Sequence, residues 1–285
     1  MIRKATHDDI PALVGFLERH IETSMFLLGN LEAHGLDNTD HPHGTAYFLR
    51  ETGDGITGVF GATNGGYLTC QLPGIGKTEA QTYAHLLKGY TLRGMTGEDA
   101  QVSTILDALP LPTDPWHINL TQPLYALDLA EMGQTDDTIR KPDAADRAVL
   151  ETWLDHYLRD TGVMPEAGIV DEIAVRAAAA VQSRTMRLLL DEAGTPIAMS
   201  DLNARAGQAV QIGGVFVPRD RRGQGLGGRV VAAQLAELTG QGIARAILFA
   251  ASSDAAKAYE KIGFRRIGDY RIAMLKAPTT LSDPT

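Results

Sequence analysis

The spacing of apolar residues changes along the chain from helical to strand-like and back. An amphipathic helix is predicted near the N-terminus by four apolar residues on one helical face: Ile10, Leu13, Val14 and Leu17. The runs TAYFLRET, GITGVFGAT and GYLTCQLPG follow, and their β-branched and aromatic residues between Gly and Asp turns predict an antiparallel meander. Another helix and closing strands complete the pattern, which indicates an α+β fold, mixed α/β around a mixed sheet.

The second half of the chain repeats this order and opens with a similar sequence. Residues 2–20 read IRKATHDDIPALVGFLERH and residues 139–157 read IRKPDAADRAVLETWLDHY, so IRK recurs at an offset of 137. A strand-like run is expected to close each half, QPLYALDLAEM at 122–132 and GDYRIAMLKA at 268–277. An internal duplication explains these likenesses better than a chance similarity between two amphipathic helix starts.

The duplication predicts two tandem domains, each a twisted mixed sheet flanked by helices. We expect the first domain over residues 1–132, a polar linker over 133–138 and the second domain over 139–285. The composition fits this division, because 285 residues with 44% hydrophobic side chains suffice for two cores.

Composition and charge also narrow the classes of function. A net charge of −9 argues against nucleic acid as a partner, because phosphate neutralisation dominates such binding. The sequence has no signal-type N-terminus and no run of about 18 apolar residues, so we expect a cytoplasmic protein without a membrane partner. The single cysteine, Cys70, excludes an internal disulfide and a multi-cysteine metal site, and we expect no metal at His41 and His43. A monomer and a homodimer both stay open.

The least ordinary stretch is PRDRRGQGLGG, residues 218–228, which joins a predicted strand to a predicted helix. The first turn of a helix offers free backbone N–H groups and a partial positive charge, and glycines let a ligand approach them closely. Arg219, Arg221 and Arg222 add positive charge. The stretch therefore predicts a binding site for a ligand that carries phosphate.

The sequence does not satisfy either of two common phosphate-binding motifs. Gly223, Gly225 and Gly228 satisfy G-x-G-x-x-G, but a dinucleotide site needs an acid at the end of the next strand, which ends in two alanines. GIGKT at 74–78 is similar to a Walker loop, but that pattern requires glycine where the chain has Gln71.

A third pattern fits. After Val217-Pro218, the residues Arg222, Gly225 and Gly227 match Arg/Gln-x-x-Gly-x-Gly/Ala, the signature of the GNAT-type N-acetyltransferases. About 30 residues later comes a run that resembles the family ending A-x-x-x-Y-x-x-x-G-F, with matches at Ala255, Tyr259, Gly263 and Phe264. The chain thus resembles a tandem member of this superfamily, similar in layout to the mycothiol synthases. Its first half is degenerate, because no such signature follows Leu72-Pro73.

The resemblance implies a site for acetyl-CoA in the second half. The loop amides would hold the diphosphate, the preceding strand would pair with the pantetheine arm, and Tyr259 would be catalytic by protonating the departing thiolate. Ser252 stands where the family often has a coenzyme-binding asparagine. The implied coenzyme-binding residues are Val215, Phe216, Val217, Arg222, Gly223, Gln224, Gly225, Leu226, Gly227 and Ser252.

We therefore expect an N-acetyltransferase that moves an acetyl group from acetyl-CoA to a small-molecule amine acceptor by direct attack. The general base is open, because Gln211 replaces the strand carboxylate of many members, and Asp201 and Glu166 are alternatives. Two other functions stay possible. One is a non-catalytic acyl-CoA-binding regulatory module, and the other is an aminoacyl-tRNA-dependent transferase, which the acidic charge disfavours.

Overall fold

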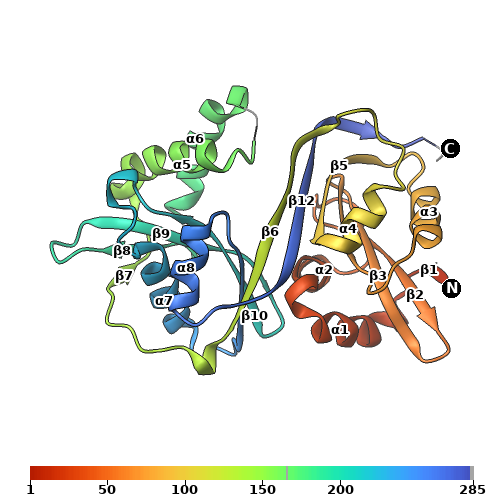
Figure 1. Ribbon diagram of the computed structural model, residues 1–285, viewed down its shortest axis with the longest axis horizontal. Coiled ribbons are helices and arrows are strands. Elements are labelled where there is room, and N and C mark those ends of the chain that lie inside the picture. The colour runs from red at the N-terminus through yellow and green to blue at the C-terminus, as the bar shows by residue number, and fades with distance from the viewer. Residues whose placement is uncertain (165, 283–285) are drawn as a thin grey trace. The chain divides into compact units, whose positions relative to one another are not determined.

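The computed structural model describes residues 1–164 and 166–282, and the chain forms two compact units (Figure 1). The first unit consists of Met1–Gln122 together with Gly268–Thr285, and the second consists of Pro123–Ile267. Most of the last strand of the chain therefore belongs to the first unit. Each unit is a mixed sheet flanked by helices, as the sequence predicts.

In the first unit, six strands take the order β1-β2-β3-β4-β5-β12. Neighbouring strands are antiparallel except β4 and β5, which are parallel. The strands are β1 (Ile2–Lys4), β2 (Thr45–Thr52), β3 (Gly55–Thr63), β4 (Tyr67–Gln71), β5 (Thr91–Glu98) and β12 (Arg265–Thr280). The helices are α1 (Ile10–Arg19), α2 (Ile21–His34), α3 (Lys77–Leu86) and α4 (Asp99–Leu106).

The second unit repeats this arrangement strand for strand, in the order β7-β8-β9-β10-β11-β6, with β10 and β11 as the parallel pair. Its strands are β6 (Trp116–Asp128), β7 (Ile139–Arg140), β8 (Arg187–Leu190), β9 (Pro196–Ala206), β10 (Ala209–Phe216) and β11 (Arg245–Phe249). Its helices are α5 (Arg147–Thr161), α6 (Glu166–Ala180), α7 (Leu226–Leu238) and α8 (Ser253–Lys261). In Figure 1, α5 and α6 cover one face of this sheet, and α7 and α8 cover the other.

The repeated opening sequence forms the same local structure twice. Arg3 clamps Asp9 through both terminal nitrogens, at 2.7 and 2.6 Å, and Arg140 clamps Asp146 in the same way at 2.5 and 2.8 Å. Each aspartate also completes a capping box that starts the following helix. The arginine of the shared IRK and the aspartate six residues after it therefore form the same motif in both units. This motif links the first strand of each unit to its first helix.

The two closing strands are exchanged between the halves of the sequence. This corrects the expectation that each run closes the sheet of its own half. Residues 124–128 of β6 pair with β11, and residues 270–280 of β12 pair with β5, so each run closes the sheet of the other half. Both runs have a similar apolar centre, LYALD in β6 and YRIAML in β12. Such a pattern identifies a strand but not the sheet edge that the strand joins.

Candidate active site

The loop after β10 has the strand-to-helix geometry that its sequence predicts. A short 3₁₀ turn at Arg219–Arg221 follows Pro218, and α7 then begins at Leu226. Gly223 and Gly225 have φ of 79° and 73°, a left-handed conformation that favours glycine. A Cβ built on either residue meets no atom within 4 Å. The loop therefore has open space beside both glycines, and it leads into the first turn of a helix, which is where anions bind.

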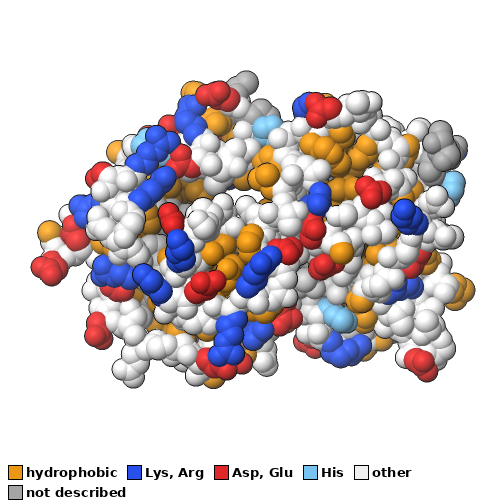
Figure 2. All heavy atoms as spheres, in the orientation of Figure 1, with side chains coloured by type: hydrophobic (Ala, Val, Ile, Leu, Met, Phe, Trp, Pro, Cys, Tyr) orange, Lys and Arg blue, Asp and Glu red, His pale blue; other side chains and the backbone are white. Residues whose placement is uncertain are grey.

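Two arginines of this loop share one carboxylate. Arg222 donates Nη2 to Asp160 at 2.5 Å, and Arg219 donates Nη2 to the other oxygen of Asp160 at 2.6 Å. Arg222 also donates Nε to the carbonyl of Val217 at 3.1 Å, which ties the loop to the end of β10. Arg222, and then Arg219, lower the pKa of Asp160. Such pairing is widespread, because basic and acidic side chains are interspersed on the face shown in Figure 2.

The strand that leads into the loop separates from its parallel neighbour. β10 pairs with β11 only as far as Gln211, opposite Ile247. On its other side, the register with β9 shifts between Gly213 and Phe216. Neither of these two ladders includes Gly214 or Val215. The backbone groups of Val215 are thus available to an extended ligand, which would add to the sheet as a strand does.

Two polar side chains approach this bulge closely. A Cβ on Gly213 would lie 2.0 Å from the side-chain amide of Asn203, and a Cβ on Gly214 would lie 3.3 Å from the Cβ of Asp201. The φ of Gly214 is also 57°. The glycine pair is therefore needed both for its backbone shape and for the close approach of β9 side chains.

Two phenols are near the same bulge. Tyr157 of α5 forms a hydrogen bond with the backbone of Gly214, and burial raises the pKa of its phenol. Tyr259 of α8 is 6% exposed and packs against Phe264, with ring centroids 6.1 Å apart. Burial, together with the neighbouring Tyr157, raises the pKa of Tyr259 well above its ordinary value. Tyr259 is therefore a protonated phenol at neutral pH.

Other residues singled out by sequence occupy different surroundings. Ser252 caps α8, since its hydroxyl accepts the backbone N–H of Ala255 at 3.2 Å. Gln211 is 2% exposed, and its Oε1 has no hydrogen-bond partner among the described residues. Glu166 is 85% exposed and pairs with Arg159 at 2.9 Å. Tyr157 was not foreseen, because its position on the apolar face of α5 is typical of a core residue.

The first unit has a different structure at the corresponding place. The residue before α3, Gly76, has an extended backbone instead of the left-handed one of Gly225. Gln101 of α4 accepts the backbone N–H of Leu72, the counterpart of Val217, at 2.5 Å. Ile105 follows the capping Glu98 by seven residues, as Tyr259 follows the capping Ser252. This unit therefore lacks both the glycine loop and the phenol.

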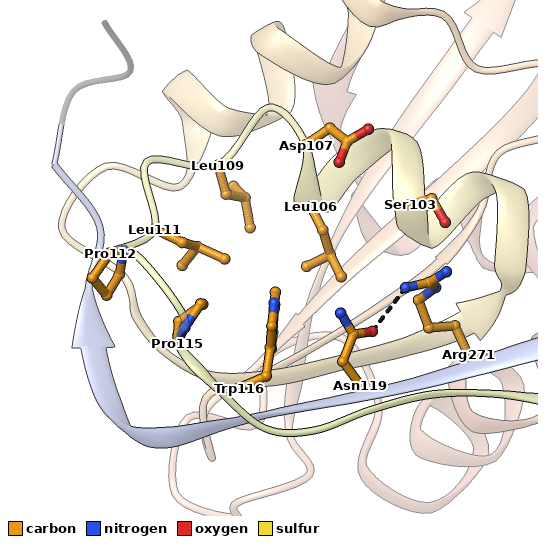
Figure 3. A pocket seen from close by; sticks show the side chains of 10 residues that line it. All are labelled: Ser103, Leu106, Asp107, Leu109, Leu111, Pro112, Pro115, Trp116, Asn119 and Arg271. Atoms are coloured by element: carbon orange, nitrogen blue, oxygen red, sulfur yellow. Dashed lines mark hydrogen bonds between the residues drawn. The ribbon is translucent and has the colours of Figure 1, made fainter.

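A cavity of about 370 Å³ does occur in the first unit, with Trp116 and several leucines and prolines on one side (Figure 3). At its polar end Arg271 donates Nη1 to Asn119 at 2.8 Å and Nε to Asp99 at 2.7 Å. The lining residues are Ser103, Leu106, Asp107, Leu109, Leu111, Pro112, Pro115, Trp116, Asn119 and Arg271. None of them belongs to the α7 loop.

Within the described ranges, no group of three or more His, Cys, Asp or Glu side chains is placed to hold a metal ion. Nor is any described helix long and apolar enough to cross a membrane.

Solved structures share this fold at low sequence identity. A GNAT-family acetyltransferase from Colwellia psychrerythraea is 12% identical, with a TM-score of 0.52 over 97% of this chain and 100% of that one. A Drosophila protein is also 12% identical, with a TM-score of 0.58 over 96% and 98% of the two chains. A GCN5-related N-acetyltransferase from Kribbella flavida is 14% identical, with a TM-score of 0.54 over 90% and 95%.

A comparison with curated proteins found no match. Residues 165–273 do match a family model, described as the acetyltransferase (GNAT) domain. The matched range includes the bulge of β10, the glycine loop and Tyr259, which are the features assembled above. Residues 165–273 of this chain therefore form a domain of the GNAT acetyltransferase family.

Proposed function

We propose that the second unit transfers the acetyl group of acetyl-CoA to the nitrogen of a small-molecule amine. The observation that carries the proposal is the sequence of three features along one stretch of chain. These are the separated strand β10, the glycine loop at the start of α7 and the buried phenol of Tyr259.

The loop and the strand fit the two ends of the coenzyme. The left-handed Gly223 and Gly225 leave the amides of the loop uncovered, which suits a diphosphate. Val215 has backbone groups outside the β10 ladders, which suits an amide of a pantetheine arm. When bound, the coenzyme supplies an acetyl group activated as a thioester.

The chain contributes positioning, polarisation and a proton. Backbone N–H groups of the separated strand are placed to polarise a carbonyl held beside them. Fixing both reactants on one strand removes much of the entropic part of the barrier. The phenol of Tyr259 keeps its proton through neutral pH and gives it to the departing sulfur.

Release of free thiol from acetyl-CoA tests the proposal directly. We expect wild type to release thiol in the presence of simple primary amines, and Tyr259→Phe to reduce kcat by about a hundredfold with unchanged coenzyme affinity. Tyr90→Phe is the control, because Tyr90 is a phenol of the first unit that bonds the carbonyl of Thr63. Tight coenzyme binding without turnover by any amine would favour the regulatory module instead.

A further inference from the structure

The proposed function requires a base that the usual position does not supply. An alkylammonium ion cannot attack a thioester until it loses a proton. Gln211 is a carboxamide and takes up no proton, although its buried Oε1 has no partner. The other carboxylates near the loop are engaged, since Asp160 holds two arginines and Asp137 holds Arg229.

Asp201 is the carboxylate that lies against the bulge of β10. It is opposite Gly213 in the β9–β10 ladder, and its Cβ is 3.3 Å from the place where a Cβ of Gly214 would lie. Residues 213 and 214 have no side chains of their own, and the amide of Asn203 fills the place of a side chain at Gly213. Asp201 is also two residues beyond Met199, which packs under α5 and α6, and so it lies on that face of the sheet.

The surroundings of Asp201 leave its carboxylate free to take up a proton. It forms no ion pair with any described residue. Its polar neighbours are the hydroxyl of Thr185, the backbone N–H of Leu202 at 2.8 Å and, at longer range, Arg187. Tyr157 approaches the bulge from α5. Burial outweighs the lowering effects of these neighbours and raises the pKa of Asp201, which makes it a stronger base.

We propose that Asp201 is the general base that removes a proton from the attacking amine, and that the acceptor is accordingly a cationic primary amine. This inference rests on the proposed acetyl transfer. Asp201 takes one proton from the ammonium ion, and the freed lone pair attacks the thioester carbon. As the carbon–sulfur bond breaks, Tyr259 gives its proton to sulfur, and its phenolate takes the second proton from the new amide nitrogen. Solvent then removes the proton from Asp201, so that one proton is released for each acetyl group transferred and charge balances.

Two nucleophiles distinguish a base from a merely structural residue. Ethylamine is an ammonium ion at neutral pH and needs a base, whereas hydroxylamine is already neutral and does not. We expect Asp201→Asn to lower kcat with ethylamine by about a hundredfold. With hydroxylamine the loss should be less than about fivefold. The acidic limb of the kcat/KM profile, in which activity rises as Asp201 loses its proton, should disappear in the variant with ethylamine.

The controls keep the outcomes separate. Glu172→Gln removes a carboxylate of α6 that pairs with Arg176 and should match wild type. Asp201→Glu keeps a carboxylate and should retain the acidic limb, and calorimetry should give Asp201→Asn the coenzyme affinity of wild type. Equal losses with both nucleophiles, or a wild type that uses hydroxylamine but not ethylamine, would overturn the role of Asp201. A wild type that does not turn over with either nucleophile would instead overturn the proposed function.

Discussion

The side-chain oxygen of Gln101 accepts the backbone N–H of Leu72 at 2.5 Å, at the end of the strand that corresponds to β10. Gln101 is 8% exposed and is held by α4, whose first turn is capped by Glu98. In the first unit, a side chain of the same chain thus bonds a backbone N–H whose counterpart in the second unit belongs to the proposed coenzyme site. The duplication has kept the fold in both copies and the loop in one.

This difference predicts one coenzyme site per chain. The first unit has no left-handed glycine at the start of α3, and Gln101 occupies the strand end. We expect native mass spectrometry with saturating acetyl-CoA to show a single coenzyme bound to each chain. Two bound coenzymes per chain would contradict the assignment of a ligand-free first copy.

Arg222 should contribute to coenzyme affinity through charge and through the shape of the loop. It bonds the carbonyl of Val217 and still has N–H groups to offer a phosphate. We expect Arg222→Ala to weaken acetyl-CoA binding about tenfold, which corresponds to about 1.4 kcal/mol. Arg205→Ala is the control, because Arg205 lies on β9 and bonds only the carbonyl of Gln241 among described partners. Equal affinity of the two variants in a titration would contradict this role.

Alkaline pH should destabilise the fold through its buried phenols. Burial raises the pKa of each of five tyrosines that are 6% exposed or less: Tyr47, Tyr83, Tyr125, Tyr259 and Tyr270. The unfolded chain loses these protons near pH 10 while the folded chain keeps them, so stability is intact below about pH 10 and falls above it. Each phenol contributes a slope of about 1.4 kcal/mol per pH unit. Urea unfolding at increasing pH should show a steep loss for wild type and a smaller slope for Tyr259→Phe.

The ion pair between Arg140 and Asp146 should stabilise the second unit against unfolding. The Asp146 side chain is 6% exposed and takes two hydrogen bonds from the guanidinium group. Asp146→Asn should lower the free energy of unfolding by about 3 kcal/mol, because it leaves a partly buried arginine without its counter-charge. Glu151→Gln, which breaks an exposed pair with Arg147, should cost less than about 0.5 kcal/mol in the same urea titration.

Sequence reasoning was most successful where local pattern decides structure. The strands at Thr45–Thr52 and Gly55–Thr63 have the bounds that their runs predict, and the helix after the glycine loop ends before Gly240 as expected. Alternation of apolar residues and glycine placement act over a few residues, so they can be recognised without the fold.

Features that depend on distant segments were not predictable in this way. The exchange of β6 and β12 is a choice between two sheet edges that their similar apolar pattern does not distinguish. The pairing of Asp160 with the loop arginines joins residues about 60 positions apart. Tyr157 has the spacing of a core residue, and only the bulge at Gly214 gives its phenol a polar neighbour.

The central claim is that the loop at the start of α7 grips the coenzyme, and calorimetry on two glycine variants tests it most directly. Gly225 and Gly240 lie at opposite ends of α7 with φ of 73° and 80°, and a Cβ on either meets no atom within 4 Å. Alanine therefore adds similar backbone strain at both sites, but only Gly225→Ala covers the loop amides. We expect Gly225→Ala to weaken acetyl-CoA binding at least tenfold and Gly240→Ala to leave it unchanged. Equal affinities for both folded variants, or no heat from wild type, would contradict the claim.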